Sequence, residues 1–487
     1  MSETNASIER WGRFELSQPA RAQVNPFLDV TFSVQFTHES GDSVRIEGFY
    51  DGDDIYRLRF MPEQVGQWRY ETQSSLPELN GIGGTFACVE ASAGNHGPVR
   101  VAHTHHFAYA DGTPHIPVGT TCYAWIHQSE ALQRQTLETL RTAPFNKMRM
   151  CVFPKSYEYN QVEPPFYPFE KDESGAWDFT RFNPAFFRHL EARIDDLAAL
   201  GIEADLILFH PYDQGRWGFD SMGAEADDRY LRYLVARLAA FRNVWWSMAN
   251  EWDLCEHKTL DDWDRFFQIV QQRDPYQHLR SIHNWHTHYD HGKPWVTHVS
   301  VQTLVTYPDL EKVADWRETF QKPVIVDETC YEGNIPFRWG YLTPQEMTHR
   351  FWLGTVLGGY VGHGETYLHP EDILWWSKGG VLRGQSPARI AFLREILTEL
   401  APEGLQPTTY ITRDLQCAGQ PERYFLAYGG RGQPAEARLN LPEGASYRAE
   451  IIDAWEMTIT PVAETLSGKC RIRLPGKPYT AMRLKQV

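Results

Sequence analysis

The sequence lacks the features of a membrane-spanning or secreted protein. No stretch approaches the roughly 18 consecutive apolar residues of a membrane span. The first residues, MSETNASIERWGRF, show neither the basic nor the apolar region of a signal peptide. The seven cysteines are scattered over 487 residues and never form a CxxC pair, which is typical of reduced thiols. We therefore expect a cytoplasmic protein.

Basic residues are in the minority. Lys and Arg together number 47 against 63 Asp and Glu, so the formal net charge is −16. This deficit argues against nucleic acid or an anionic membrane as the main partner. The negative net charge is compatible with a neutral or cationic ligand, and it can also serve solubility alone. Aromatic residues are plentiful, with 17 Trp, 23 Tyr and 26 Phe, and such rings fill large cores and stack on apolar ligand faces.

Both ends of the chain have the pattern of short β-strands. Residues 32–36 alternate apolar and polar side chains, and Asp51-Gly52 is a hairpin signal between two such runs. Strands at this regular spacing predict a β-sandwich for residues 1–98. Short apolar runs separated by Pro, Gly and Glu predict a second, smaller β-sandwich for residues 403–487.

Residues 99–402 alternate apolar runs with helical stretches such as PAFFRHLEARIDDLAALG. The runs are 115–121, 148–153, 204–209, 244–248, 280–283, 298–304, 323–326 and 357–361. Eight strand candidates over roughly 290 residues are typical of an α/β fold of the (β/α)₈ TIM-barrel type. The competing doubly wound sheet would carry a Gly-rich phosphate loop after its first strand, and GTTCYAWIHQ has none.

Two strands of the predicted barrel end in glutamate. In run four, NVWWSMANEWD, the period-2 alternation turns Glu251 into the barrel mouth. In run seven, KPVIVDETCYEG, it gives Glu328 the inward phase and Asp327 the outward phase, unless a β-bulge reverses this. Retaining glycoside hydrolysis needs two opposed carboxylates about 5–5.5 Å apart, one to protonate the leaving oxygen and one to attack the anomeric carbon. The rivals of Glu328 are Asp327, Glu332 and Glu365.

The Asn-Glu pair ending strand four and the Glu ending strand seven resemble the clan A retaining glycoside hydrolases. The resemblance implies that Glu251 is the acid/base, that Asn250 binds the 2-hydroxyl and that Glu328 is the nucleophile. Four further segments are similar to bacterial proteins that are assigned as glycoside hydrolases and are related to the apiosidase-like barrels. They are GFYDGDDIYRLRFMPEQVGQWRYET, HVSVQ, HGETY and IIDAWEMTI. This likeness covers nearly the whole chain and implies that the sandwich of residues 1–98 is Ig-like.

Two further positions follow from the same resemblance. Many clan A enzymes carry a Tyr on strand six that hydrogen-bonds the nucleophile. Here that strand offers Gln302, and Tyr307 lies only beyond it, so the partner of Glu328 stays open. The clan often has a basic residue on strand two that supports the nucleophile, which makes Arg149 a candidate.

Other candidates for sugar binding lie at predicted strand ends or on the loops that follow them, where barrels build active sites. They are Tyr123, Trp125, His210, Trp217, His283, Trp339 and Glu365. Aromatic rings can stack on the apolar face of a sugar, and His or Glu side chains can hold hydroxyl groups. The alternative is core packing for the rings and a helix cap for Glu365.

The stretch HNWHTHYDH keeps a different chemistry open. His286 and His288 form an HxH pair, which on a barrel can bind zinc and activate water. No further ligand set stands out, so we expect neither metal nor cofactor. We predict a retaining glycosidase that acts in exo mode on small oligosaccharides or glycosides. The partner would be a small carbohydrate, with a homo-oligomer left open, and the alternatives are a metal-dependent hydrolase and a non-catalytic carbohydrate-binding protein.

Overall fold

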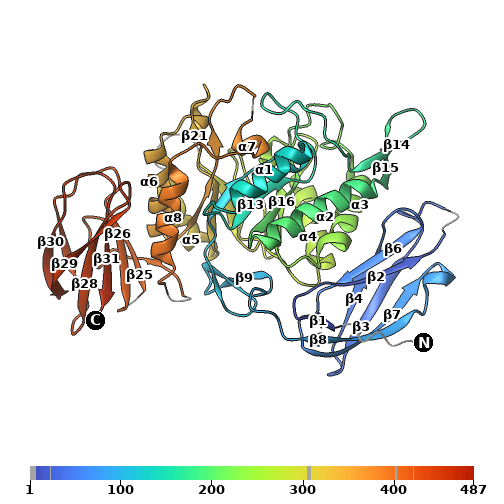
Figure 1. Cartoon of the computed structure of the whole chain (residues 1–487), viewed down its shortest axis with the longest axis horizontal. Coiled ribbons are helices and arrows are strands. Elements are labelled where there is room, and N and C mark those ends of the chain that lie inside the picture. The colour runs from blue at the N-terminus through green and yellow to red at the C-terminus, as the bar shows by residue number, and fades with distance from the viewer. Residues whose placement is uncertain (1–6, 22–23, 304–308, 372, 401–402, 421) are drawn as a thin grey trace.

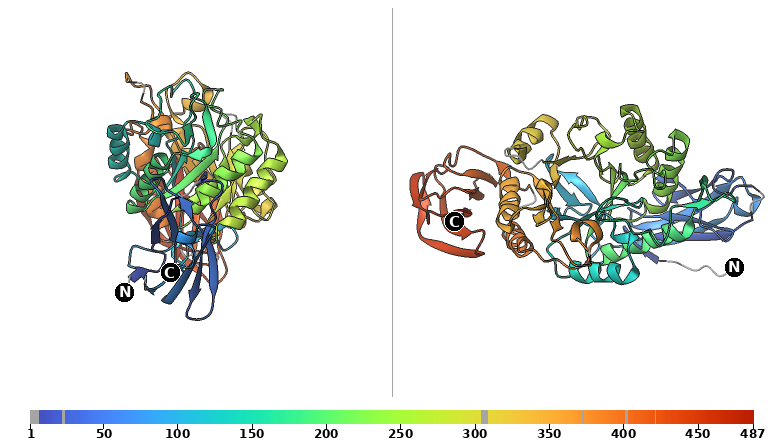
Figure 2. Two further views of the ribbon diagram at one scale, coloured as in Figure 1. Left: turned by 90° about the vertical axis from the view of Figure 1, so that its right-hand side faces the viewer. Right: turned by 90° about the horizontal axis from the view of Figure 1, so that it is seen from above.

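A computed structural model describes residues 7–21, 24–303, 309–371, 373–400, 403–420 and 422–487. It consists of an N-terminal β-region, a central barrel and a C-terminal β-sandwich, which follow one another along the molecule (Figure 1). Seen from above, the two β-rich parts lie at opposite ends of the barrel (Figure 2). The predicted fold class is confirmed.

Two β-sheets face each other in the N-terminal part, in the orders β1-β8-β7-β3-β4 and β2-β6-β5. Their bounds are β1 Ser7–Glu9, β2 Phe14–Pro19, β3 Phe32–His38, β4 Ser43–Glu47, β5 Phe49–Tyr50, β6 Ile55–Phe60, β7 Gly66–Ser74 and β8 Gly83–Val89, with the short helix η1 Pro77–Leu79 between the last two. Phe36 of β3 stacks on Phe60 of β6 at 4.1 Å. Rings from both sheets therefore fill the space between them.

Eight parallel strands form the central barrel, in the order β18-β17-β16-β13-β12-β22-β20-β19. In chain order they are β12 Gly119–Thr121, β13 Lys147–Cys151, β16 Glu203–Phe209, β17 Val244–Ala249, β18 Arg280–Ser281, β19 Val299–Gln302, β20 Val324–Glu328 and β22 Tyr360–His363. Each lies within or overlaps one of the eight predicted runs. Most of these residues are buried on both faces, as expected of strands covered by helices.

Helices cover the outside of the barrel. They are α1 Glu130–Leu140, α2 Pro184–Ala199, α3 Ala224–Leu238, α4 Leu260–Arg273, α5 Val313–Phe320, α6 Pro344–Val356 and α8 Ser386–Leu397. The short helices on the connecting loops are η2 Trp125–His127, η3 Trp252–Leu254, η4 Asp309–Lys312, η5 Arg338–Gly340 and α7 Trp375–Lys378. Asn183 caps α2, and Thr259 with Asp262 forms a capping box on α4. Among the described residues, no helix is long and apolar enough to cross a membrane.

The barrel is nearly closed. Strands β18 and β19 are the two ends of its ladder, and we call the boundary between them the seam. Near its base, the Thr297 amide donates to the Arg280 carbonyl at 2.9 Å. Further up, contacts come from side chains, since His283 Nδ1 lies 3.3 Å from Ser300 Oγ. Residues 282–298, all of them described, connect the two strands without a helix.

Strand β20 departs from regular alternation just before its end. Its pairing with β19 skips Asp327 through a register shift, which marks a β-bulge. The Asp327 carboxylate points into the barrel, 2.7 Å from Lys147 Nζ and 2.6 Å from Ser300 Oγ. The outward phase expected for Asp327 was therefore wrong, because the bulge allows it and Glu328 to turn inward together.

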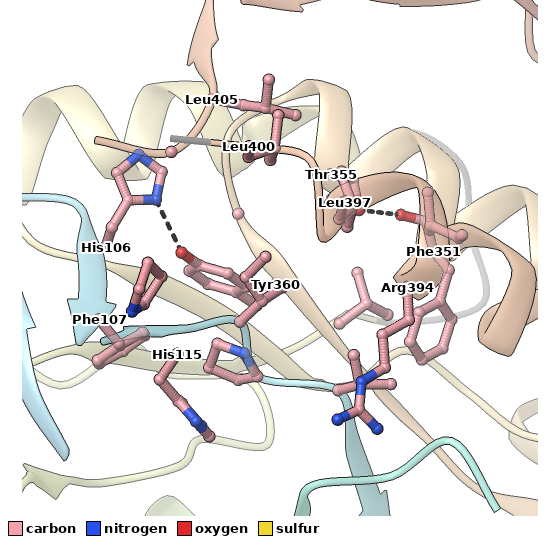
Figure 3. Close-up of a pocket in the computed structure, with 18 of the residues that line it drawn as sticks. His106, Phe107, His115, Phe351, Thr355, Tyr360, Arg394, Leu397, Leu400 and Leu405 are labelled. Carbon is pink, nitrogen blue, oxygen red and sulfur yellow. Dashed lines mark hydrogen bonds between the residues drawn. The ribbon is translucent and has the colours of Figure 1, made fainter. Parts of the chain in front are cut away.

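A small three-stranded sheet covers the amino end of the barrel, made of β9 Val99–Ala102, β10 His106–Tyr109 and β11 Pro114–His115. Phe107 packs 5.3 Å from the ring of Trp245 at the base of β17. Figure 3 shows a pocket beside this contact, where His106 Nδ1 lies 2.7 Å from the Tyr360 hydroxyl. Its volume of about 60 Å³ has room for a few water molecules and not for a sugar.

The C-terminal sandwich packs a six-stranded sheet, β24-β25-β26-β31-β28-β29, against the pair β27-β30. The bounds are β24 Gln406–Pro407, β25 Gln416–Gln420, β26 Tyr424–Tyr428, β27 Glu436–Asn440, β28 Ser446–Asp453, β29 Thr458–Ser467, β30 Lys469–Arg473 and β31 Thr480–Gln486. The hydroxyl of Tyr428 lies 3.1 Å from His349 Nδ1 of α6. The remaining short strands are β14 Phe169–Lys171, β15 Trp177–Phe182, β21 Glu332–Gly333 and β23 Glu365–Thr366.

Candidate active site

A cavity of about 500 Å³ lies at the carboxyl ends of the barrel strands. Each of the eight strands contributes to it, either by its last residues or by the loop that follows. The lining residues are Tyr123, Lys155, Tyr157, Tyr212, Asn250, Glu251, Trp285, His286, Gln302, Thr303, Glu328, Cys330, Tyr331, Arg338, Trp339 and Trp376. This is the face on which barrels of this type build active sites.

Glu251 lies two residues beyond the end of β17 and has a left-handed backbone with φ of 51°. Such a conformation costs about 1–3 kcal/mol in a residue other than glycine and is concentrated at functional sites. The Tyr212 hydroxyl donates a hydrogen bond to its carboxylate. Burial, and after it the nearby charge of Glu328, raises the pKa of Glu251 to about 8, against the opposing charge of Lys155. Glu251 is therefore mostly protonated at neutral pH.

Glu328 ends β20 and faces the same cavity. The Tyr123 hydroxyl donates to its carboxylate, and His283 Nε2 lies 3.3 Å from Oε1. Burial alone would raise the pKa of Glu328, but hydrogen bonds from His283 and Tyr123 and the charge of His283 lower it to about 2. Glu328 is thus ionised at neutral pH. Its partners come from the ends of strands one and five, which answers the question that the sequence left open.

Gln302 of β19 lies between the two glutamates. With its amide turned so that nitrogen faces the carboxylates, this nitrogen is 3.1 Å from Glu251 Oε1 and 3.2 Å from Glu328 Oε2. One amide nitrogen therefore lies within hydrogen-bonding distance of both carboxylates, so the two glutamates face each other across Gln302. Tyr307, the other residue considered for this strand, lies outside the described residues.

Asn250 is oriented by its neighbours beneath the cavity. Its Oδ1 accepts from Arg149 Nη2 at 3.1 Å and also lies 3.1 Å from the Tyr123 hydroxyl oxygen, whose proton goes to Glu328. The side-chain NH₂ group remains as the donor toward a ligand. Arg149 is buried beneath the cavity and does not line it, and its guanidinium also lies 3.3 Å from Asp327. Arg149 thus supports the site through Asn250 and Asp327.

Aromatic rings form much of the cavity wall. Trp339, which the sequence suggested, lies 4.8 Å from Trp376, and Tyr157 lies 5.4 Å from the same indole. At the rim, Trp285 is 38% exposed and its ring lies 3.6 Å from that of His286. These surfaces can stack on the apolar faces of sugar rings.

Two aromatic residues proposed for sugar binding have packing roles instead. Trp125 is completely buried and donates its indole N–H to the Met150 sulfur at 3.0 Å. Trp217 is buried beside Phe219, with ring centroids 6.3 Å apart. Neither lines the cavity, because the loops after β12 and β16 turn both rings into the core.

Two polar candidates also bind the protein itself. His210 is buried, with Nε2 3.2 Å from the Phe153 carbonyl and Nδ1 accepting the Tyr212 amide at 3.1 Å. It therefore holds the backbone of Tyr212 and leaves no ring nitrogen for a sugar. The Glu365 carboxylate accepts the backbone amides of Arg383 and its neighbour at 2.5 and 2.7 Å. Backbone groups thus take the polar atoms of both residues, and neither lines the cavity, so their hydroxyl-binding role stays a prediction.

Sequence reasoning missed Tyr212, which lies three residues beyond the end of β16, and Lys155, which lies two residues beyond the predicted run 148–153. The only signal was that proximity to a strand end. The HxH pair is split, since His286 lines the cavity while the His288 ring lies 5.4 Å from that of Trp316. Within the described part of the chain, no three His, Cys, Asp or Glu side chains are grouped to hold a metal ion.

Comparison with protein families assigns the barrel. Residues 102–387, more than half of the chain, match the family model described as the apiosidase-like catalytic domain. The chain belongs to the apiosidase-like family. The parts that flank this apiosidase-like barrel match two domains of unknown function, DUF5060 over residues 7–75 and DUF5605 over residues 413–485.

Solved structures agree with this assignment. The apiosidase-like chain is 45% identical to a "putative glycoside hydrolase" from Bacteroides vulgatus, with a TM-score of 0.93 and coverage of 99% of this chain and 100% of that one. A family 5 glycoside hydrolase from the same organism is 15% identical with a TM-score of 0.63, over 80% of this chain and 93% of that one, and shares the fold. No curated protein matches this chain. The family and the fold support a glycosidase on a clan-A-like barrel.

Proposed function

We propose that this protein is a retaining glycoside hydrolase in which Glu251 is the acid/base and Glu328 the nucleophile. One observation carries the proposal. Gln302 lies within hydrogen-bonding distance of both carboxylates, and their pKa values are displaced in opposite directions, to about 8 and about 2. A neutral acid beside an ionised carboxylate is the arrangement that such catalysis requires.

The reaction would proceed in two displacements. In the first, Glu251 gives its proton to the glycosidic oxygen while a Glu328 oxygen bonds to the anomeric carbon, and the protonated aglycone leaves. In the second, the Glu251 carboxylate takes a proton from water, the water oxygen bonds to the anomeric carbon, and Glu328 leaves as a carboxylate. Tyr123 and His283 hold Glu328 in place, and the Asn250 amide is placed to donate to the 2-hydroxyl.

The cavity supports small substrates. Its volume of about 500 Å³ lies in the lower half of the range for pockets that enclose small ligands, roughly 300–1,000 Å³. Bulky rings such as Trp339 and Trp376 close its sides. We therefore propose exo action on small oligosaccharides or glycosides, with a single sugar ring enclosed between the two glutamates.

The test is hydrolysis of aryl glycosides in both anomeric series and in pyranose and furanose forms. Glu251→Gln and Glu328→Gln should each lose roughly 10³-fold or more in kcat/KM, whereas Glu256→Gln, an exposed glutamate on the loop after β17, should match the wild type. The released sugar, followed by NMR before mutarotation, should have the anomeric configuration of the substrate.

Several results would contradict the proposal. Release of the opposite anomer would exclude the two-step mechanism. If Glu251→Gln and Glu328→Gln keep full activity, the catalytic residues must lie elsewhere in the molecule. Loss of activity on exhaustive chelation would revive the metal-dependent alternative that His286 suggested.

A further inference from the structure

A buried lysine lies inside the candidate active site and has no role in the two displacements described above. Lys155, on the loop after β13, is 2% exposed and lines the cavity. Its ammonium lies over four aromatic rings, 4.0 Å from the centroid of Tyr212, 4.1 Å from Tyr123, 4.4 Å from Tyr157 and 5.3 Å from Trp376. Among the described residues, it forms no ion pair within 4.0 Å of a carboxylate.

This environment is costly for a cation unless it is compensated. Removing an ammonium group from water carries a large desolvation penalty. Ring faces return part of it, because the negative face of an aromatic ring attracts a cation and does so more strongly when the contact is desolvated. Lys155 is therefore held mainly by the electron-rich faces of its neighbours, and it in turn holds those rings.

Two of these rings are the ones that contact the catalytic pair. The Tyr123 hydroxyl donates to Glu328, and the Tyr212 hydroxyl donates to Glu251. A single ammonium thus lies against both tyrosines whose hydroxyls hold the two carboxylates. Resting on the function proposed above, we infer that Lys155 is a positioning residue, which fixes Tyr123 and Tyr212 against the glutamates and supplies a positive charge that favours their ionised forms.

The charges around the site predict the direction in which the pKa of Glu251 changes when Lys155 is replaced. Burial raises the pKa of Glu251, Glu328 and Asp253 add to the effect, and Lys155 opposes it. Lys155 itself faces Cys151, both glutamates and Arg149, and burial lowers its pKa. Removing its charge would raise the pKa of Glu251 further, so protonated Glu251 would persist to higher pH.

The experiment compares pH profiles of kcat/KM for the wild type, Lys155→Met and Lys155→Arg. Lys155→Met removes the charge, so the fall of kcat/KM on the high-pH side of the profile (the basic limb) should move to higher pH by about one unit. Its kcat should also be roughly 10- to 100-fold lower, because the tyrosines lose their support. Lys155→Arg keeps the charge, so its limb should stay near that of the wild type. Lys171→Met is the matched control, since Lys171 lies 4.6 Å from the Trp177 ring on the β14–β15 hairpin, outside the cavity.

A double-mutant cycle with Tyr212→Phe separates positioning from simple loss of structure. If Lys155 acts through Tyr212, the effects of Lys155→Met and Tyr212→Phe on kcat/KM should be strongly non-additive. An unmoved basic limb in Lys155→Met, or additive effects in the cycle, would overturn the inference.

Folding is checked by thermal unfolding of every variant. If Lys155→Met does not fold, Lys155→Gln is measured in the same way, and an unmoved limb there overturns the inference as well. Failure of the proposed function itself would look different, because Glu251→Gln or Glu328→Gln would then remain active whatever happened at Lys155.

Discussion

The buried charges beneath the cavity predict a large effect from a single substitution. Lys147 of β13 is completely buried, and its Nζ lies 2.5 Å from Asp205 and 2.7 Å from Asp327. Lys147→Met removes the cation and leaves both buried carboxylates to Arg149, whose Nη1 lies 3.3 Å from each. Removing one partner of a buried ion pair costs about 3–5 kcal/mol, because the remaining charge is uncompensated.

Thermal unfolding is the assay. For a domain of this size, each kcal/mol shifts Tm by about 2–4 °C, so Lys147→Met should melt at least about 6 °C below the wild type at pH 7. Lys171→Met, at an exposed lysine, should change Tm by less than about 2 °C. A Lys147→Met Tm within 2 °C of the wild type, roughly 1 kcal/mol, would refute the reasoning.

The difference should also depend on pH. Burial by itself would raise the pKa of Asp327, but Lys147 and Arg149 hold it well below its usual range. A carboxyl whose pKa is lowered on folding adds stability above its unfolded value of about 3.9, and this stability is lost as pH falls. Without Lys147 this contribution is smaller, so the gap in Tm between variant and wild type should stay nearly constant from pH 7 to about pH 4 and narrow as pH falls further.

Three further predictions concern catalysis. The wild-type kcat/KM should fall as pH rises through about 8, since Glu251 must carry its proton, and a flat profile from pH 4 to 9 would contradict this. Gln302→Leu, which removes the amide between the two carboxylates, should lower kcat/KM roughly 10- to 100-fold in initial-rate assays with little change in Tm; an unchanged rate would show that the amide is dispensable. Trp285→Ala should raise KM roughly 3- to 10-fold with kcat nearly constant, because the exposed ring offers stacking area alone. An equally large loss in kcat would contradict this, since it would show that the ring stabilises the transition state.

The barrel could be predicted because its strands carry their own signal. Runs such as 204–209 are apolar throughout, as strands buried on both faces must be, and helical patterns separate them. The phase of Asp327 could not be predicted in the same way. A β-bulge depends on pairing with a neighbouring strand, and periodicity within one segment holds no information about that neighbour.

The site was most predictable at and near the ends of strands. Glu251, Glu328 and Gln302 are at strand ends, and the structure brings all three to one cavity. Lys155 and Tyr212 lie on loops whose course depends on long-range contacts. His210 shows the converse, because a histidine beyond a strand end looks the same in sequence whether its nitrogens meet a sugar or the backbone carbonyl of Phe153.

The seam has a consequence for how this scaffold can change. Glu251 follows β17 and Glu328 ends β20, so the short route between them around the barrel crosses the open boundary between β18 and β19. Near the cavity, that boundary is spanned by side chains such as His283 and Ser300 instead of a continuous backbone ladder. We expect substitutions there to widen or narrow the gap between the two carboxylates without breaking strand pairing. Under the function proposed above, the carboxyl separation that sets the stereochemical outcome would then be adjustable by a few side chains while the rest of the wall stays intact.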